Sequence, residues 1–522
     1  MDDPLPPRDL NGPGQAAHSA EPAAGPRLTR RELLRAVVAG GVAVGVASLG
    51  YWGLAPAVRP APATPTLPTP PGSYPAGSFL YRTRPDLWSP TVDVVHQAAG
   101  AADGCILLTP ATGPGPVIVD DAGHTLWIHP NTESRAFNLR MATYQGRPVL
   151  TWFEGQIVLG TGRGEYVLMD ETYAEVTRVR AGNGLAGDLH EFIVTPEGTA
   201  LFTAYVQAPE PGATLVASPT AAGILDSVVQ EVDIATGRVL FEWHASEHID
   251  IAESYASRSA DAPFDFFHVN SIDVEPDGNL LVSARHTWTV YRINRSTGQV
   301  IWRLGGKKSD FAMEPATSFS WQHDARRQPD GSISLFDDGS NGTPPPTEDH
   351  SRAIVLDVDE VNFTATLRRA YGHDPLLSAG SQGSVQALPN GDFLVGWGDQ
   401  PWFTEYTADG DTVLDASMPN GSFSYRAFRF EWHGRPLDRP TVVAMPFDGV
   451  TTLYASWNGA TEIADWVVLG GPAADALSPI STQPWIGFET ALTISSQPAF
   501  VAARALDGSG AVLGESGAIA TT

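Results

Sequence analysis

The chain has 522 residues, too many for one small hydrophobic core, so its length predicts two or more folded units. Its 52 glycines and 43 prolines fall mostly between short runs of β-branched and aromatic residues, a pattern that favours an all-β fold. The formal net charge of −27 argues against a nucleic-acid partner, because such a surface repels phosphate backbones. The one cysteine, Cys105, lies in an apolar run and excludes an intramolecular disulfide.

The first part of the chain predicts an export segment followed by a spacer. Residues 1–26 are rich in Pro, Gly and Ala, and we expect them to be disordered. Residues 27–58 carry the paired Arg30 and Arg31 ahead of a long apolar stretch, as in a twin-arginine signal or a membrane anchor. Both cleavage of this segment and its retention fit the sequence. Residues 59–84 form a Pro-rich, semi-rigid linker, and we expect everything after them to work outside the cytoplasm.

Residues 85–430 repeat a β unit. Each unit contains two strands joined by a Pro-x-Gly turn, and later a second pair of strands around a glycine turn. Proline presets φ at the second turn position, and glycine supplies the left-handed residue that closes the hairpin. Four strands per unit is the make-up of a propeller blade, and the sequence predicts six blades, with five or seven also compatible. The turns are Pro196-Glu197-Gly198, Pro276-Asp277-Gly278, Pro329-Asp330-Gly331 and Pro389-Asn390-Gly391.

These turns also predict a ring of side chains around the propeller axis. If the strand before each turn is the innermost of its blade, equivalent positions face the central channel at the same level. The residues six positions before the turn proline are His190, Asn270, His323 and Gly383. Three of the four carry polar nitrogen atoms, and we interpret the glycine as leaving room for a ligand.

The hairpin "FHVNSIDVEPDGNLLVSARH" adds two candidates to this ring. His268 lies two residues before Asn270, so a regular strand would place both side chains on the same face. Arg285, on the returning strand, can reach the same region. His286 follows directly, and alternation predicts that it faces the other side, outside the site.

An arginine among several imidazoles suits the binding of sulfate or phosphate. A guanidinium donates forked hydrogen bonds to the non-bridging oxygens. A neutral imidazole can attack such a group, while a second histidine protonates the leaving oxygen. The set suits a transition metal less well, because neither Arg nor Asn is a typical ligand, so no metal or other cofactor is expected. No glycine-rich phosphate loop is evident, which argues against a nucleotide donor.

Three segments carry a family resemblance: "GDLHEFIVTPEGTALFTAY", "FHVNSIDVEPDGNLLVSARHTWTVYRINRSTGQVIWRLGG" and "FSWQHDARRQPDGSISLFDDG". They resemble the bacterial arylsulfate sulfotransferase family, and within it the divergent Gram-positive branch. The resemblance implies a six-bladed propeller that moves a sulfuryl group from a phenolic sulfate ester to another phenol, without 3′-phosphoadenylyl sulfate. The implied partners are small aryl sulfates and phenols. Gram-negative members usually use a disulfide, which a single cysteine cannot supply.

The resemblance also implies roles for five residues. His323, in Trp-Gln-His, matches the histidine that becomes transiently sulfated. His268 and Asn270 match a His-x-Asn pair that holds the sulfuryl oxygens, and Arg285 matches an arginine that stabilises them. His190, in Asp-Leu-His-Glu, matches a further histidine at the channel mouth, a candidate acid and base.

Residues 431–522 alternate like antiparallel strands and predict a small β-sandwich resembling fibronectin type III, with Trp466 in its core. Two other functions fit the whole sequence. One is a non-catalytic exported propeller whose ring binds an anion or a glycan. The other is a quinone- or metal-dependent oxidoreductase, which is the least favoured because the ring position lacks acidic metal ligands.

Overall fold

The computed structural model describes residues 77–521, apart from 131–133, 212–222, 260, 344–345 and 420. The predicted disordered start, the signal or anchor segment and most of the linker therefore lie outside the described residues. Within this part of the chain, no helix is long and apolar enough to cross a membrane. The helical elements described are α2 (Ala245–His248) and the 3-10 turns η1 (Ile251–Glu253) and η2 (Pro315–Thr317). Nearly everything else is strand or turn, and the predicted all-β fold is confirmed.

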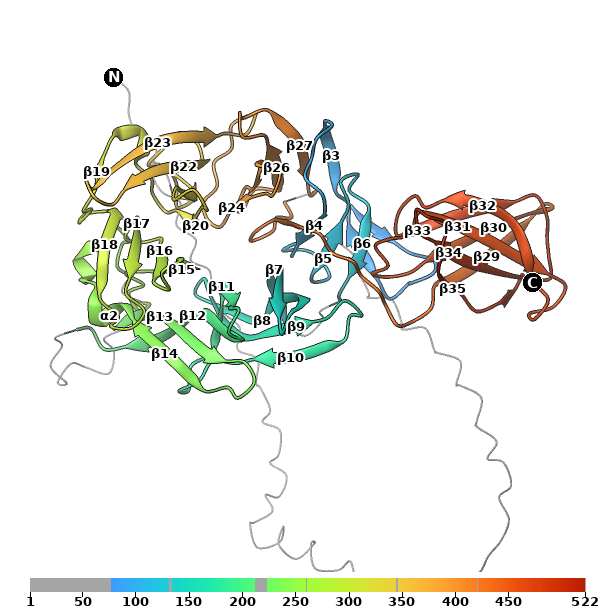
Figure 1. Cartoon of the computed structure of the whole chain (residues 1–522), viewed down its shortest axis with the longest axis horizontal. Coiled ribbons are helices and arrows are strands. Elements are labelled where there is room, and N and C mark those ends of the chain that lie inside the picture. Colours follow the sequence, from blue (N-terminus) through green and yellow to red (C-terminus); the bar gives the residue numbers. More distant parts are fainter. Residues whose placement is uncertain are drawn as a thin grey trace, which may run out of the picture. The chain divides into compact units, whose positions relative to one another are not determined.

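The described strands form six blades around a central channel (Figure 1). We number the blades from blade 1, which holds β4. Blade 1 consists of β28 (Phe428–Phe430), β4 (Cys105–Leu108), β5 (Val117–Val119) and β6 (Thr125–Ile128). Blade 2 consists of β7 (Arg135–Tyr144), β8 (Arg147–Val158), β9 (Thr161–Met169) and β10 (Glu175–Val179). Blade 3 consists of β11 (Gly187–Val194), β12 (Thr199–Ala208), β13 (Ile224–Asp233) and β14 (Val239–His244), and it joins blade 2 through one pairing of β11 with β9.

The remaining three blades follow the same plan. Blade 4 consists of β15 (Val269–Val274), β16 (Leu280–Ala284), β17 (Thr289–Ile293) and β18 (Val300–Gly305). Blade 5 consists of β20 (His323–Arg327), β21 (Ile333–Asp337), β22 (Arg352–Asp359) and β23 (Thr364–Tyr371), with β19 (Ala312–Met313) on its edge. Blade 6 consists of β24 (Ser384–Ala387), β25 (Phe393–Gly396), β26 (Trp402–Tyr406) and β27 (Thr412–Ser417). The strands before the four Pro-x-Gly turns are thus all innermost, as the ring prediction requires.

The ring is closed by an exchange of strands between its two ends. β28 follows blade 6 in the chain but pairs with β4, opposing Phe428 to Leu107 and Phe430 to Cys105. In return, β3 (Asp93–Gln97) precedes blade 1 but pairs with β27 of blade 6. β28 thus supplies the innermost strand of blade 1, and β3 extends the outer edge of blade 6.

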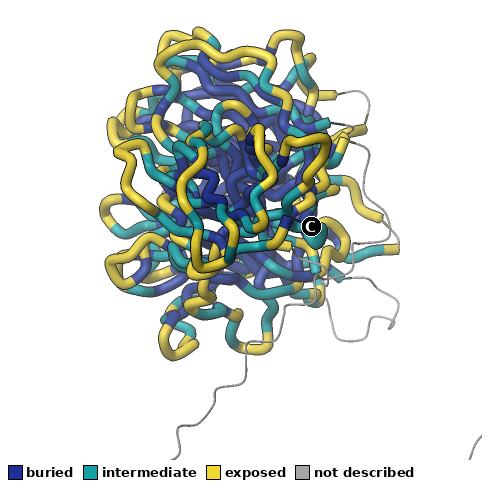
Figure 2. Tube along the Cα trace, turned by 90° about the vertical axis from the view of Figure 1, so that its right-hand side faces the viewer, coloured by how far each residue is buried: buried dark blue, intermediate teal, exposed yellow. Residues whose placement is uncertain are grey.

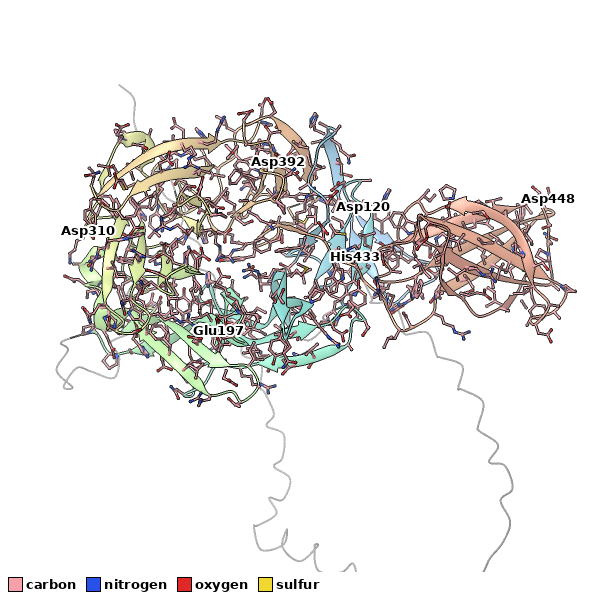
Figure 3. All side chains as sticks on the ribbon, in the orientation of Figure 1. Asp120, Glu197, Asp310, Asp392, His433 and Asp448 are labelled. Carbon is pink, nitrogen blue, oxygen red and sulfur yellow. The ribbon has the colours of Figure 1, made fainter. Side chains whose placement is uncertain are left out.

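Apolar clusters fill the spaces between neighbouring blades. Successive residues of a strand point to opposite faces, so a blade buried on both faces needs an apolar side chain at nearly every position. In β16, Leu280 packs into the cluster between blades 3 and 4, whereas Leu281 packs into the cluster between blades 4 and 5. Exposed residues gather in the outer turns, and buried ones follow the strands (Figure 2). Acidic side chains such as Asp310 and Asp448 lie in such exposed turns (Figure 3).

The C-terminal region forms a two-sheet sandwich. One sheet has the order β29 (Thr441–Phe447), β30 (Val450–Ser456) and β33 (Glu489–Ile494). The other has the order β32 (Ser478–Pro484), β31 (Asp465–Gly471), β34 (Phe500–Leu506) and β35 (Val512–Glu515), with β36 (Ile519–Ala520) also on β34. Trp466 is fully buried in its core, as predicted. The likeness to fibronectin type III stays a prediction. Before the propeller, β1 (Ser78–Leu80) pairs with β2 (Trp88–Pro90).

Candidate active site

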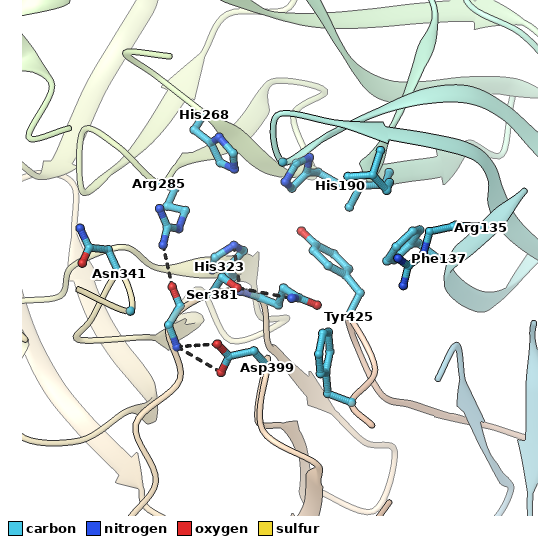
Figure 4. Close-up of a pocket in the computed structure, with 17 residues that line it drawn as sticks. Arg135, Phe137, His190, His268, Arg285, His323, Asn341, Ser381, Asp399 and Tyr425 are labelled. Carbon is cyan, nitrogen blue, oxygen red and sulfur yellow. Dashed lines mark hydrogen bonds between the residues drawn. The ribbon is translucent and has the colours of Figure 1, made fainter. Parts of the chain in front are cut away.

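A cavity of about 470 Å³ lies where the innermost strands of the blades begin (Figure 4). Every innermost strand, or the residues just before it, contributes to the wall. These residues are Arg135 and Phe137 (β7), Leu189 and His190 (β11), His268 (β15), His323 (β20), Ser381 and Gln382 (β24), and Phe423 and Tyr425 (β28). Loops supply further wall residues, among them Arg285, Gly380 and Asp399. The structure therefore brings four of the five predicted site residues to one cavity: His190, His268, Arg285 and His323.

The ring of His323 is held as a neutral imidazole. Its Nδ1 lies 2.7 Å from Oδ2 of Asp338, which directly follows β21. Its Nε2 accepts a hydrogen bond of 3.2 Å from the backbone N–H of Gln382, so the ring proton sits on Nδ1 and is donated to Asp338. Burial, with the positive charge of Arg285 nearby, holds the pKa of His323 well below its usual range. A neutral ring with an unprotonated Nε2 is the nucleophilic form of histidine.

His190 is oriented by a charged carboxylate in the same way. Its Nδ1 lies 2.6 Å from Oδ2 of Asp188. The hydroxyl of Thr203 and the backbone N–H of His190 donate to the same oxygen, each at 2.9 Å. Burial alone would raise the pKa of Asp188, but His190 and these donors bring it below its ordinary value. Such a carboxylate stabilises an imidazolium, which suits His190 to gain and lose a proton.

His268 is placed by an unusual backbone conformation. It directly precedes β15 with a φ of 56°, in the left-handed region that a non-glycine residue seldom adopts. Its Nδ1 bonds Oδ2 of Asp265, and its ring centroid lies 4.9 Å from that of His190. Burial and the neighbouring His190 lower the pKa of His268 well below its usual value. Three histidines are thus anchored at Nδ1 by aspartates, which turns each Nε2 toward the cavity.

Arg285 is the buried cation of the cavity wall, which also carries the more exposed Arg135. One Nη donates to the carbonyl oxygen of Gly380 at 2.7 Å, and the guanidinium carbon lies 5.0 Å from the ring centroid of Trp321. Among the described residues, no carboxylate forms an ion pair with Arg285 and its Nε has no hydrogen-bond partner. In a chain with a net charge of −27, an unpaired guanidinium in a cavity is a site for an anionic group.

His286 does not line the cavity, in agreement with its expected place outside the site, but it contacts two residues that do. Its Nε2 accepts a hydrogen bond of 3.1 Å from Arg285, and its Nδ1 donates to the backbone oxygen of Asp265 at 2.6 Å. Its ring lies 4.6 Å from that of His268, centroid to centroid. β16 ends at Ala284, so His286 lies in a turn, where the alternation of a strand does not apply. His286 therefore supports two wall residues from behind.

Two members of the predicted ring do not reach the cavity wall. Asn270 is fully buried, and its amide donates to the backbone oxygen of Gln322 at 2.6 Å, between blades 4 and 5. Its part in substrate binding stays a prediction. Gly383 has a φ of +108°, and a Cβ there would lie 2.3 Å from Phe336. The glycine therefore makes room for Phe336 rather than for a ligand.

Bulges in the inner strands explain why the regular pattern fails here. The strand register shifts in β7 between Phe137 and Arg140, and in β11 between Gly187 and Phe192. It shifts again in β15 around Asn270 and in β20 after His323. A bulge leaves an unpaired residue and re-aims the side chains around it, so the two-residue period cannot be carried across it. All four bulges lie at the level of the cavity.

The bulges also allow a second set of polar side chains, one to three residues further along the chain, to meet inside the propeller. We call this set the charge layer: Glu191, Asp324, Arg140, Arg326 and Arg426. Glu191 is fully buried and pairs with all three arginines, with Nη1 of Arg426 at 3.2 Å from its carboxylate. Although burial raises the pKa of Glu191, the three guanidinium groups bring it below its ordinary value. The charge layer joins blades 2, 3 and 5 to the closing segment.

Asp265, His268 and His286 could in principle hold a metal ion, because one ligand atom from each lies within 4.8 Å of the others. However, the facing nitrogen of His286 already accepts from the guanidinium of Arg285, which would repel a cation. The arrangement suits an anion better than a metal. The thiol of Cys105 is also unsuited to chemistry, because burial raises its pKa to about 11.

The sequence profile of the arylsulfotransferases (ASST) matches residues 140–419, which is more than half of the chain. The chain belongs to the arylsulfotransferase family. Membership supports a function of the arylsulfotransferase type, with small aryl sulfates and phenols as the substrate class. No curated protein matches the chain.

The solved structures described below are only distantly similar to this arylsulfotransferase-family chain. A protein of unknown function from Bacteroides caccae aligns over 63% of this chain and 98% of its own, at 14% identity and a TM-score of 0.39. A streptogramin B lyase aligns over 69% and 93%, at 10% identity and a TM-score of 0.32. The Dos1 propeller aligns over 73% and 80%, at 10% identity and a TM-score of 0.30. At these scores none of the likenesses carries an argument about function.

Several residues of this arylsulfotransferase-family site were missed by the sequence prediction. Asp338 lies fifteen positions after its partner His323, and no local spacing points to it. Phe423 and Tyr425 precede β28, which has no Pro-x-Gly turn and belongs to a blade at the other end of the chain. The matched segment ends at residue 419, before both aromatic residues. The orders Asp188-x-His190 and Asp265-x-x-His268 were the available local signals of carboxylate partners.

Proposed function

We propose that this protein transfers a sulfuryl group from an aryl sulfate ester to a phenolic acceptor through a covalent sulfo-His323 intermediate, without a nucleotide donor. The observation that carries the proposal is the state of His323: Nδ1 is bonded to Asp338, Nε2 has no proton, and Arg285 lies beside it in the same cavity. A nucleophile, its orienting carboxylate and an unpaired cation are the parts that sulfuryl transfer to an imidazole requires.

The two walls of the cavity match the two halves of an aryl sulfate. Phe137, Leu189 and Phe423 form an apolar side, against which an aromatic ring can pack. Arg285 lies on the other side, beside His268, and its guanidinium can donate to the sulfuryl oxygens. A wall of each kind facing one space supports an aryl sulfate as the substrate.

In the first step, the Nε2 lone pair of His323 attacks sulfur while the bond from sulfur to the aryl oxygen breaks. The leaving phenolate takes a proton from His190, which Asp188 keeps correctly oriented. The ring of sulfo-His323 becomes positively charged, and Asp338 stabilises that charge through Nδ1–H. The free phenol then leaves the cavity.

In the second step, an acceptor phenol occupies the apolar side. His190, now neutral, removes the phenolic proton as the acceptor oxygen attacks sulfur. The bond from sulfur to Nε2 breaks and its electron pair returns to His323. Both histidines recover their starting states, so one sulfuryl group and no net proton have moved between the two phenols.

We also propose that the protein works outside the cytoplasm. The support is the paired Arg30 and Arg31 followed by a long apolar stretch, in a part of the chain outside the described residues. A fusion of residues 1–84 to a reporter that is active only after folded export would test this. Export that survives Arg30→Lys with Arg31→Lys would contradict it.

The catalytic proposal is tested with 4-nitrophenyl sulfate as donor and phenol as acceptor. We expect release of nitrophenolate that depends on phenol, and a mass increase of one sulfuryl group on His323 when the acceptor is omitted. In His323→Ala both signals should disappear. Binding of 4-nitrophenyl sulfate without turnover or histidine modification would overturn the proposal and leave an anion-binding propeller instead.

A further inference from the structure

Tyr425 has a buried hydroxyl group with nothing to bond to. The residue is 2% exposed, and its Oη has no hydrogen-bond partner among the described residues. Its ring centroid lies 5.7 Å from that of His190 and 6.3 Å from that of His323. In Figure 4 the hydroxyl points into the cavity, toward the space between these two histidines.

A phenylalanine at this position would keep the packing and avoid the cost of an unpaired hydroxyl, which is about 1–3 kcal/mol for a buried group. Two neighbouring positions do carry phenylalanine: Phe137 packs edge-on against Tyr425, and Phe423 lines the same wall. Buried polar groups in folded proteins nearly always have partners. The hydroxyl of Tyr425 therefore fits a role in which its partner is a bound molecule.

The position of Tyr425 indicates which atom of the substrate that partner is. In an aryl sulfate, one bridging oxygen joins the ring to the sulfuryl group. If the ring packs on Phe137 and Phe423 and the sulfuryl group lies at Arg285 and His323, the bridging oxygen must lie at the border between the two sides. Tyr425 belongs to the apolar side by its ring and reaches this border with its hydroxyl.

The protonation of Tyr425 defines its role as a donor. Burial raises the pKa of its phenol well above the ordinary value, and the adjacent cation Arg426 opposes the shift only in part because Glu191 already pairs with it. The phenol therefore keeps its proton at neutral pH. Tyr425 can therefore give a hydrogen bond but cannot serve as the base, a task that remains with His190.

We propose that Tyr425 is a further catalytic residue, whose hydroxyl donates a hydrogen bond to the bridging oxygen as negative charge develops on it. In the second step the same donor binds the oxygen of the acceptor phenol in its place. Tyr425 loses no proton in either step, so the transfers assigned to His190 are unchanged. This inference rests on the proposed sulfuryl transfer and adds the group that stabilises the leaving phenolate.

The test compares Tyr425→Phe with the wild-type protein on two donors: 4-nitrophenyl sulfate, whose phenolate leaves readily, and phenyl sulfate, whose phenolate leaves poorly. More charge has to be stabilised on the poorer leaving group. We expect kcat/KM to fall about 100-fold with phenyl sulfate and only about 10-fold with 4-nitrophenyl sulfate. A purely structural role would lower both values by the same factor.

Tyr205→Phe is the matched control. Tyr205 is also buried beside His190, but its hydroxyl donates to the backbone oxygen of Val269 at 2.6 Å and it does not line the cavity. Its loss should leave the ratio of the two donor rates at the wild-type value. An unchanged ratio in Tyr425→Phe, with wild-type thermal unfolding, would overturn the role of Tyr425. Absence of transfer from either donor by the wild-type protein would instead overturn the proposed function.

Discussion

Two adjacent layers of the propeller interior both consist of buried polar residues, but one forms the candidate site and the other a structural network. In the cavity layer, His190, His268 and His323 are each satisfied at Nδ1 and turn Nε2 toward the cavity. In the charge layer, one residue further along the strands, Glu191 is paired with three arginines and touches no cavity. Both layers are buried and polar, so burial and polarity alone do not distinguish a site from a structural network.

The difference lies in which groups face the cavity. A buried network of ion pairs away from the cavity holds the blades together, and removing one partner is costly. A buried imidazole anchored at Nδ1 is held rigidly and presents its unprotonated Nε2 to the cavity. The comparison predicts that substitutions in the cavity layer reduce activity with little effect on stability, and that substitutions in the charge layer do the reverse.

The largest effect is expected from Asp338→Asn. The amide can donate to Nδ1 of His323 and so favours the tautomer with its proton on Nε2, where the lone pair is needed. We expect kcat to fall about 10⁴-fold, by analogy with other carboxylate–histidine pairs, while thermal unfolding changes little. Asp337→Asn is the control, because the neighbouring Asp337 bonds Arg352 and does not contact His323. Equal losses of kcat in the two variants would show that contact with His323 is not what makes Asp338 important.

The next largest effect is expected from Glu191→Gln, and it concerns the stability of the fold rather than the activity. The substitution removes the charge that pairs Arg140, Arg326 and Arg426 in a buried space. The free energy of unfolding should fall by about 3–5 kcal/mol, measured by denaturant titration. The exposed pair of Arg368 with Asp357 provides the contrast, since Arg368→Met should cost less than about 1 kcal/mol. A loss below that value in Glu191→Gln would contradict a structural charge layer.

His286 provides a finer test, because one of its ring nitrogens accepts a hydrogen bond and the other donates one. Gln at this position can replace Nε2 as the acceptor for Arg285, whereas Asn can replace only the donor to the oxygen of Asp265. We expect His286→Asn to lower kcat/KM for 4-nitrophenyl sulfate by about 10-fold to 100-fold, and His286→Gln by much less. The pH profile of kcat/KM should not move in either variant. Similar losses in both would mean that His286 only fills space.

The smallest effect is a dependence of stability on pH. Burial lowers the pKa of His286 to about 3, whereas in the unfolded chain it is about 6.5. As the pH falls below about 6.5, the unfolded state binds a proton that the folded state does not, so stability is full above this pH and declines below it. Between pH 7 and pH 5 we expect His286 to account for a loss of about 1–2 kcal/mol in the free energy of unfolding. In His286→Gln this part of the decline should be absent.

The sequence predicted the blades well because turn chemistry is local. Proline and glycine at Pro276-Asp277-Gly278 and its equivalents determine each inner hairpin, and counting back from them led to His190 and His323. The count failed where the backbone leaves the regular strand. The bulge at Asn270 changes which side that residue faces, and His286 lies in a turn rather than in a strand. None of these departures has a sequence signature as clear as a turn.

Contacts set by the closure of the ring could not be predicted from local sequence at all. Tyr425 and Arg426 stand before a strand that pairs with β4, more than three hundred residues earlier in the chain. Asp338 reaches His323 across the hairpin of blade 5. Such partners are fixed by the three-dimensional arrangement of the blades, which only the structure provides.

The exchange of strands at the ring closure also determines when in folding the cavity becomes complete. β28 follows blade 6 in the chain and completes blade 1, so the cavity is complete only once the two ends of the ring have met. Until that moment Tyr425 and Phe423 are missing from the wall and Arg426 from the network below it. All six blades thus contribute residues to the cavity wall, and no single blade forms it alone. Enzymatic turnover would then require a closed ring of all six blades, so no isolated part of the chain should be active.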